Sequence, residues 1–192
     1  MLTWTVGIDP GLRETGLCLL NHLGIAIEAL TIKAQPASQA SDLERIFRLA
    51  KGVSAQICHW RVHIPPEAAL LFSIEYPIMN AGNVTNYRKQ INTLYAIEHE
   101  LAYQGIGQYL IEVNPSESKL HSTGDGGATK AEIIAVSPFT GSGHTIETMA
   151  DAWLHGQCGR AMAAANWSKV IDLGNIQTYP YNFHAREDGL DV

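Results

Sequence analysis

Two apolar segments of the chain look like buried strands, and each of them ends near a carboxylate. Residues 2–8 (LTWTVGI) run directly into Asp9 and a Pro-Gly turn, and residues 69–77 (ALLFSIEYP) contain Glu75 near their end. A strand that is apolar on both faces is typical of the centre of a mixed or parallel sheet. A charged group beside such a core is costly unless it is paired or binds a metal ion. The pattern therefore predicts a sheet with a polar site at the ends of its central strands.

The predicted elements follow the order β-β-β-α-β-α-β-α, with a hairpin meander first and alternating strands and helices afterwards. We expect strands at 2–8, 16–20, 25–32, 69–77 and 108–113, and helices at 42–60, 85–103, 116–121, 128–136 and 145–165. This order predicts an α/β fold with a mixed five-stranded sheet and helices on both faces. The 192 residues suffice for one domain, which we expect at 1–168, followed by a polar C-terminal tail at 169–192.

Composition and charge restrict the partners of the chain. The net charge of −6 gives no bulk attraction for a polyanion, although a local basic strip can still bind phosphate. No apolar run of about 18 residues is present, and the first residues lack the basic head of a signal peptide. The odd number of cysteines (Cys18, Cys58 and Cys158) fits reduced thiols. We therefore expect a cytoplasmic protein with no membrane partner.

A third acid, Asp151, lies in a predicted helix whose other positions are largely apolar. Alone, Asp9 could be an ordinary turn residue before Pro-Gly, and Glu75 could simply leave the sheet at its edge. Three acids that face one core are better explained by a hard divalent cation such as Mg²⁺, which prefers carboxylate oxygens. Two such ions about 4 Å apart would support attack of water on a phosphodiester.

Four motifs in order resemble those of the RuvC Holliday junction resolvases, a family of the RNase H-like superfamily. They are "GIDPGLRETG", "FSIEYPIM", "NPSESKLHSTGDGGATK" and "ADAWLHG", and the resemblance covers about residues 5–160. In the third motif the family pattern of Pro, Lys, two Gly and a second Lys is matched at Pro115, Lys119, Gly124, Gly126 and Lys130. The acidic net charge and the departures described below suit a divergent, phage-type member of that family.

The resemblance implies an RNase H-like fold and a metal-dependent endodeoxyribonuclease that resolves four-way junctions by paired nicks, in recombination and repair. It implies two Mg²⁺ ions per active site, with Mn²⁺ as a substitute. The implied metal ligands are Asp9, Glu75 and Asp151, Lys119 would assist catalysis at the phosphate, and the DNA contacts would be Lys119, Lys130, Arg88, Lys89, Tyr76 and Ile78. Ile78 stands where the family often has an aromatic wedge, and an aliphatic side chain can also unstack bases.

The fourth metal ligand is the main departure from the family pattern. The family usually has an acid or histidine three residues before the last Asp, and here that position is Thr148. Glu147 lies on nearly the same helical face, so we expect it to be the fourth ligand, with Thr148 and His144 as the other candidates. The structural alternative for Glu147 is an ordinary acid in a first helical turn, where the helix dipole favours it.

Symmetric cutting of two strands requires two sites, so a homodimer is expected on branched DNA. The apolar residues of the second long helix would serve either the dimer interface or the core: Ile91, Leu94, Tyr95 and Ile97. A helicase partner, if there is one, is not identified by the sequence. Two alternative functions stay open, a nuclease for other branched DNA or RNA-DNA hybrids and a junction-binding protein that does not cleave.

Overall fold

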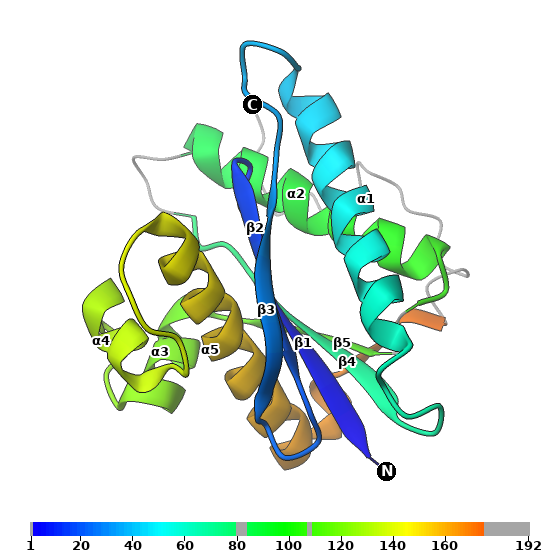
Figure 1. Ribbon diagram of the computed structural model, residues 1–192, viewed down its shortest axis with the longest axis vertical. Coiled ribbons are helices and arrows are strands. Elements are labelled where there is room, and N and C mark those ends of the chain that lie inside the picture. The colour runs from blue at the N-terminus through cyan, green and yellow to red at the C-terminus, as the bar shows by residue number, and fades with distance from the viewer. Residues whose placement is uncertain (1, 80–83, 107–108, 175–192) are drawn as a thin grey trace, which may run out of the picture.

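The computed structural model describes residues 2–79, 84–106 and 109–174, and it contains one six-stranded mixed sheet (Figure 1). The strands are β1 (Thr3–Asp9), β2 (Glu14–Leu20), β3 (Ala26–Lys33), β4 (Ala69–Glu75), β5 (Tyr109–Val113) and β6 (Ile171–Asp172). Their order across the sheet is β3-β2-β1-β4-β5-β6. β1, β4 and β5 are parallel, whereas β2, β3 and β6 run antiparallel to their neighbours. The expected mixed sheet is confirmed, with one short strand more than the five predicted.

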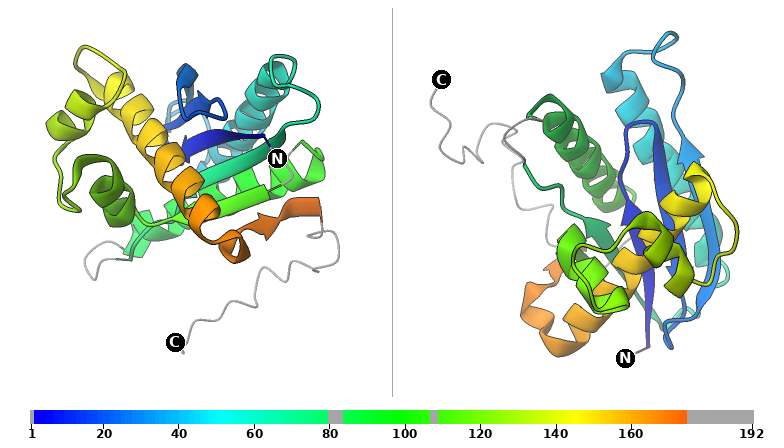
Figure 2. Two further views of the ribbon diagram at one scale, coloured as in Figure 1. Left: turned by 90° about the horizontal axis from the view of Figure 1, so that it is seen from below. Right: turned by 90° about the vertical axis from the view of Figure 1, so that its left-hand side faces the viewer.

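Helices cover both faces of this sheet, as predicted (Figure 2). They are α1 (Asp42–Arg61), α2 (Val84–Tyr103), α3 (Pro115–Thr123), α4 (Lys130–Val136), α5 (His144–Ala165) and the short 3-10 helix η1 (Trp167–Lys169). α1 and α2 lie on one face, and α5 lies on the other with α3 and α4 beside it. Within the described residues, no helix combines the length and apolarity needed to cross a membrane.

Local capping explains where several helices begin. Ser41 and Glu44 form a capping box at the start of α1, and a Ser followed three residues later by a Glu is a sequence signal for a helix start. Thr129 and Glu132 form a second capping box at the start of α4, and Asn114 caps α3 through its side chain. The caps at Asn114 and Thr129 therefore fix where α3 and α4 begin, and these two helices carry Lys119 and Lys130 of the third motif.

The main hydrophobic core lies between the sheet and helices α1 and α2. It includes Trp60, Phe72, Leu94 and Ile97, all fully buried. Ile91 and Tyr95 are partly buried and pack against the same core, so the apolar face of α2 contributes to the core of the protomer. The sequence allowed this face to serve either a dimer interface or the core, and the structure places Leu94 and Ile97 in the core.

On the other face, α5 crosses the sheet at very close range. A Cβ atom built on Gly7 of β1 would lie 1.9 Å from the Ala152 carbonyl oxygen and 2.7 Å from the Gly156 nitrogen. Only a residue without a side chain allows this approach. The Ser73 hydroxyl of β4 donates a hydrogen bond of 2.6 Å to the His155 carbonyl oxygen. These contacts hold the middle of α5 against β1 and β4.

The segment after α5 returns to the far edge of the sheet. β6 pairs with β5, and Leu173 is only 2% exposed within the main core. The rings of Trp167 and Tyr109 meet edge to face, with centroids 5.1 Å apart. The part of the predicted tail that the structure describes, up to residue 174, is thus packed on the domain, and residues 175–192 lie outside the described part.

Candidate active site

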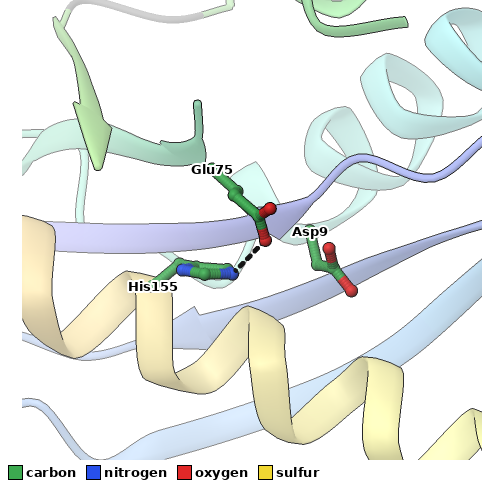
Figure 3. Close-up of side chains that lie close together, drawn as sticks. All are labelled: Asp9, Glu75 and His155. Atoms are coloured by element: carbon green, nitrogen blue, oxygen red, sulfur yellow. Dashed lines mark ion pairs between the residues drawn. The ribbon is translucent and has the colours of Figure 1, made fainter. Parts of the chain in front are cut away.

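Asp9 and Glu75 lie next to each other because their strands are parallel neighbours in the sheet. Ile8 of β1 pairs with Ile74 of β4, so each acid follows its paired residue at the same edge (Figure 3). One possible ligand atom from each acid and one from His155 all lie within 4.8 Å of one another. The structure therefore brings together the two strand-end acids that the sequence singled out, and it adds a histidine.

His155 was not predicted from the sequence. Its ring is 2% exposed, with Nε2 2.8 Å from Glu75 Oε2 and Nδ1 3.1 Å from the Ser118 hydroxyl (Figure 3). His155 follows Asp151 by four residues on α5, and residues with that spacing share one face of a helix. This spacing is the one signal in the sequence that could have indicated His155.

Asp151 of α5 is 7% exposed, and its charge helps to raise the pKa of Asp9, but it is outside the cluster of potential metal ligands found among the described residues. Its carboxylate forms an ion pair with the Lys130 ammonium, from the first residue of α4. The Lys130 side chain is 53% exposed, so its charge also reaches solvent. The second lysine of the third motif therefore stands at the mouth of the acidic site, where a phosphate could reach it.

The pKa values of these groups show how strongly the acids interact. Burial, followed by the negative charge of Glu75, raises the pKa of Asp9 to about 7. Burial works against ionised Glu75 too, but the contact with His155 outweighs it and lowers the pKa of Glu75. Burial disfavours charge on His155 and Lys130, yet Glu75 raises the pKa of His155 and Asp151 raises that of Lys130. Negative charge is thus in excess, and an added cation would relieve it.

The predicted fourth ligand, Glu147, lies in the first turn of α5. Its Oε2 is 4.0 Å from Nδ1 of His144, and it is outside the cluster of potential metal ligands found among the described residues. Thr148 is 4% exposed, and its hydroxyl donates to the His144 carbonyl oxygen at 2.9 Å. The role of Glu147 as a ligand stays a prediction.

The predicted DNA contacts lie on several elements around the site. Lys119 is half-buried on α3, directly after Ser118, the hydroxyl partner of His155. Arg88 is exposed in the first turns of α2, whereas Lys89 forms an ion pair of 2.9 Å with Asp42 of α1. Two further candidates follow β4, the partly buried Tyr76 and the exposed Ile78. Their contacts with DNA stay predictions, and the pairing of Lys89 with Asp42 reduces its free charge.

This arrangement can hold a hard metal ion chemically. Asp9, Glu75 and Asp151 offer carboxylate oxygens, which suit Mg²⁺ or Mn²⁺, and His155 offers an imidazole nitrogen. Among the described residues, the Nε2 atom of His155 is a buried polar atom with no properly aligned hydrogen bond. Excess negative charge fits a bound cation, and such an ion could bind Nε2 after displacing the proton that Nε2 shares with Glu75.

The chain was compared with known proteins, and no protein-family model matches it. It is 30% identical over 135 residues to the crossover junction endodeoxyribonuclease RuvC of Neorickettsia sennetsu (strain ATCC VR-367 / Miyayama). The aligned region covers 67% of this chain and 72% of that relative. Thermus thermophilus RuvC has a similar structure, with a TM-score of 0.61 at 20% identity, covering 88% of this chain and 99% of that one. T. thermophilus RuvC in complex with a Holliday junction substrate gives a TM-score of 0.61 at 18% identity, covering 88% and 98%. These structures share the RNase H-like fold of this protein. By its sequence, the chain belongs to the RuvC family of crossover junction endodeoxyribonucleases.

Proposed function

We propose that this protein is a metal-dependent endonuclease that resolves four-way DNA junctions by hydrolysing phosphodiester bonds in two strands. The observation that carries the proposal is the cluster of Asp9, Glu75 and His155, with the ion pair of Asp151 and Lys130 close enough to act on Asp9. Membership of the RuvC family supports the same activity, as does the fold shared with a RuvC bound to a Holliday junction. We place this activity in DNA recombination and repair, in the cytoplasm.

Family membership implies dependence on a divalent metal ion. We propose Mg²⁺, two ions per active site, with Mn²⁺ as a substitute, held by Asp9, Glu75 and Asp151. Bound ions of this kind supply an activated water and stabilise charge on the departing oxygen. The carboxylates of β1 and β4 would hold such ions at one edge of the sheet, because parallel pairing places Asp9 beside Glu75.

The basic residues of the third motif would act on the DNA. Lys130 combines a raised pKa with an exposed side chain, so it can carry its positive charge to a phosphate at the site. Lys119 would polarise a phosphate from the adjacent helix, α3. Arg88 would contact the backbone from α2, and Lys89 would contribute less because Asp42 already balances its charge.

We propose that Ile78 acts as an aliphatic wedge at a junction base, with Tyr76 beside it. Both residues follow β4 directly after Glu75, and Ile78 is an exposed large apolar side chain. An apolar wedge that unstacks a base step bends the nucleic acid and fits branched better than linear DNA. This placement supports a substrate in which bases at the branch are already partly unstacked.

We propose a homodimer as the active form. A four-way junction with two-fold symmetry presents two equivalent strands, and paired nicks require two equivalent active sites. Leu94 and Ile97 are buried in the protomer core, so the interface would use other side chains. Analytical ultracentrifugation tests this directly, since a monomer at the concentrations that support paired cutting would contradict the proposal.

The decisive experiment is cleavage of a labelled mobile four-way junction beside matched linear duplex, fork and RNA-DNA hybrid, with Mg²⁺ and with Mn²⁺. We expect symmetric nicks in the junction, and we expect Asp9→Asn to abolish them. Preferential cutting of the fork or the hybrid would instead identify that nucleic acid as the preferred substrate. No cutting of any substrate by the wild-type protein would overturn the proposed activity.

One observation favours a second candidate, a protein that binds junctions without cutting them. Position 148 carries a buried threonine whose hydroxyl is already engaged by the His144 carbonyl oxygen. If no other residue completes the metal site, a second ion would lack support. Tight binding to the junction without cleavage in either metal would identify this function.

A further inference from the structure

We propose that His155 is a direct metal ligand through Nε2, and that it replaces the ligand that Thr148 does not supply. This inference rests on the proposed metal-dependent site. It adds a ligand that follows Asp151 in the sequence, whereas Thr148 precedes it. Four observations carry it: the burial of the ring, the hydrogen bond that fixes its orientation, the distances within the cluster, and the chemistry at position 148.

The first observation concerns the exposure and partners of the His155 ring. The residue is 2% exposed, and its Nε2 points at the carboxylates of Asp9 and Glu75 (Figure 3). Nε2 forms an ion pair with Glu75 Oε2 at 2.8 Å, without the alignment of a hydrogen bond. A cation bound by both atoms would displace the proton from Nε2 and take its place between the nitrogen and the oxygen.

The second observation is the partner of the other ring nitrogen. Nδ1 of His155 lies 3.1 Å from the Ser118 hydroxyl, which is itself fully buried on α3. A serine hydroxyl can accept a proton from Nδ1, and that tautomer of the ring leaves Nε2 without a proton. Histidines that bind metals commonly donate their second ring nitrogen to such a partner, which leaves the other nitrogen with a free lone pair.

The third observation is the spacing of the donor atoms. One atom each from Asp9, Glu75 and His155 lie within 4.8 Å of one another. Neighbouring ligands of an octahedral ion with bonds of about 2.1 Å are separated by about 3 Å. The 2.8 Å between Nε2 and Oε2 is close to that separation. The two side chains can therefore bind one ion with little rearrangement.

The fourth observation concerns the face of α5 that reaches the site. The Thr148 hydroxyl donates a hydrogen bond of 2.9 Å to the His144 carbonyl oxygen of its own helix. Thr148 and His155 stand three residues before and four residues after Asp151, so both positions are on its helical face. The metal-binding side chain that is missing at position 148 is thus available at position 155.

A nitrogen ligand would change the metal preference of the site. Imidazole binds first-row transition ions better than it binds Mg²⁺, which prefers oxygen ligands and retains its waters. We therefore expect Mn²⁺ to bind more tightly than Mg²⁺. His155 would therefore favour a first-row divalent transition ion in binding affinity, while Mg²⁺ could still occupy the site through its carboxylate ligands.

Electron spin echo spectroscopy of Mn²⁺ bound to the full-length protein tests the proposal without relying on activity. A histidine nitrogen bonded to Mn²⁺ modulates the echo, and labelling the histidines with ¹⁵N changes that modulation. We expect the nitrogen signal in the wild-type protein and its loss in His155→Gln, with Mn²⁺ binding weakened about tenfold or more. Ser118→Ala should weaken Mn²⁺ binding in the same direction while the nitrogen signal persists.

Three further variants complete the design. His121→Gln, on the exposed surface of α3, is the matched control and should keep both the signal and the affinity. His144→Gln and Glu147→Gln test the competing ligands of the first turn of α5. The proposal is overturned if wild-type protein with bound Mn²⁺ shows no nitrogen signal, or if the signal is lost with His144→Gln instead.

The remaining outcomes are also decisive. Weaker Mn²⁺ binding in Glu147→Gln but not in His155→Gln would overturn the proposal in favour of Glu147. Circular dichroism checks that His155→Gln is folded, and if it is not, the wild-type and His144→Gln spectra decide between the two histidines of α5. Failure of the proposed function is distinguishable, because it would appear as absent junction cleavage whatever the nitrogen signal.

Discussion

Lys130 forms an ion pair with Asp151 across 21 residues of sequence, at the mouth of the site that holds Asp9 and Glu75. The ammonium group belongs to the first residue of α4, whereas the carboxylate belongs to the middle of α5. Lys130 therefore partly neutralises three neighbouring acids in the absence of another cation. If Asp151 binds a divalent ion as proposed, Lys130 would compete with that ion, and a DNA phosphate would compete with Asp151 for Lys130.

The first prediction concerns this competition. Lys130→Met should tighten the binding of Mn²⁺, because Asp151 no longer has a competing cation. The same change should weaken junction binding and reduce its dependence on salt by about one counterion, as expected for the loss of one phosphate contact. Isothermal titration with Mn²⁺ and junction binding at several salt concentrations measure the two effects. Lys51→Met, on the exposed face of α1, is the control; weaker Mn²⁺ binding in Lys130→Met would contradict the prediction.

The second prediction follows from the pKa of Asp9, which burial and Glu75 raise from 3.8 to about 7 in the folded protein. The folded state holds the Asp9 proton more tightly than the unfolded chain, so stability is lost as the pH rises from about 4 to about 7. Asp9→Asn removes this loss. Metal-free Asp9→Asn should therefore melt above the wild-type protein at neutral pH, although it should not cleave junctions.

Thermal melts in a chelator, recorded over that pH range, measure the effect. The difference in melting temperature between Asp9→Asn and the wild-type protein should increase up to about pH 7 and then stay constant. Glu67→Gln, at an exposed loop position, should follow the wild-type curve throughout. Parallel melting curves for Asp9→Asn and wild type over this pH range would contradict the raised pKa of Asp9.

The third prediction links metal binding to pH through the same carboxyl group. A metal ion binds the ionised carboxylate, so it must displace the Asp9 proton at any pH below about 7. Saturating Mg²⁺ or Mn²⁺ should raise the melting temperature more above pH 7 than below it. The same melts on Asp9→Asn are the control. In that variant, the metal-induced rise in melting temperature should be nearly the same above and below pH 7. An equal rise at both pH values would contradict the prediction.

The fourth prediction concerns the segment after α5. Leu173 is 2% exposed and belongs to the main core. Leu173→Ala should lower the free energy of unfolding by about 2–5 kcal/mol, the usual range for truncating a buried leucine. Leu43→Ala, at an exposed position of α1, should cost far less. Urea denaturation measures both, and equal small losses would support a domain that ends at residue 168.

Much of the fold could be predicted from local patterns. Apolar runs indicated β1 and β4 with their terminal acids, and the Ser41 and Glu44 pair indicated the start of α1, because these signals lie within a few residues of one another. β6 was not predicted, since two residues of a polar stretch form a strand only when β5 offers a free edge. Its pairing depends on a contact far away in the sequence.

The sequence by itself determined which residues could serve the site: Asp9, Glu75 and Asp151 through their apolar surroundings, and Lys130 through the motif that resembles RuvC. The tertiary structure alone decided how they meet. Parallel pairing sets Asp9 beside Glu75, and the absence of a side chain at Gly7 lets α5 approach the sheet closely. That approach places Nε2 of His155 2.8 Å from Glu75, a contact between residues on different elements. Local sequence patterns indicate the chemistry of each residue, but only packing between distant elements brings one ligand atom each of Asp9, Glu75 and His155 within 4.8 Å of one another.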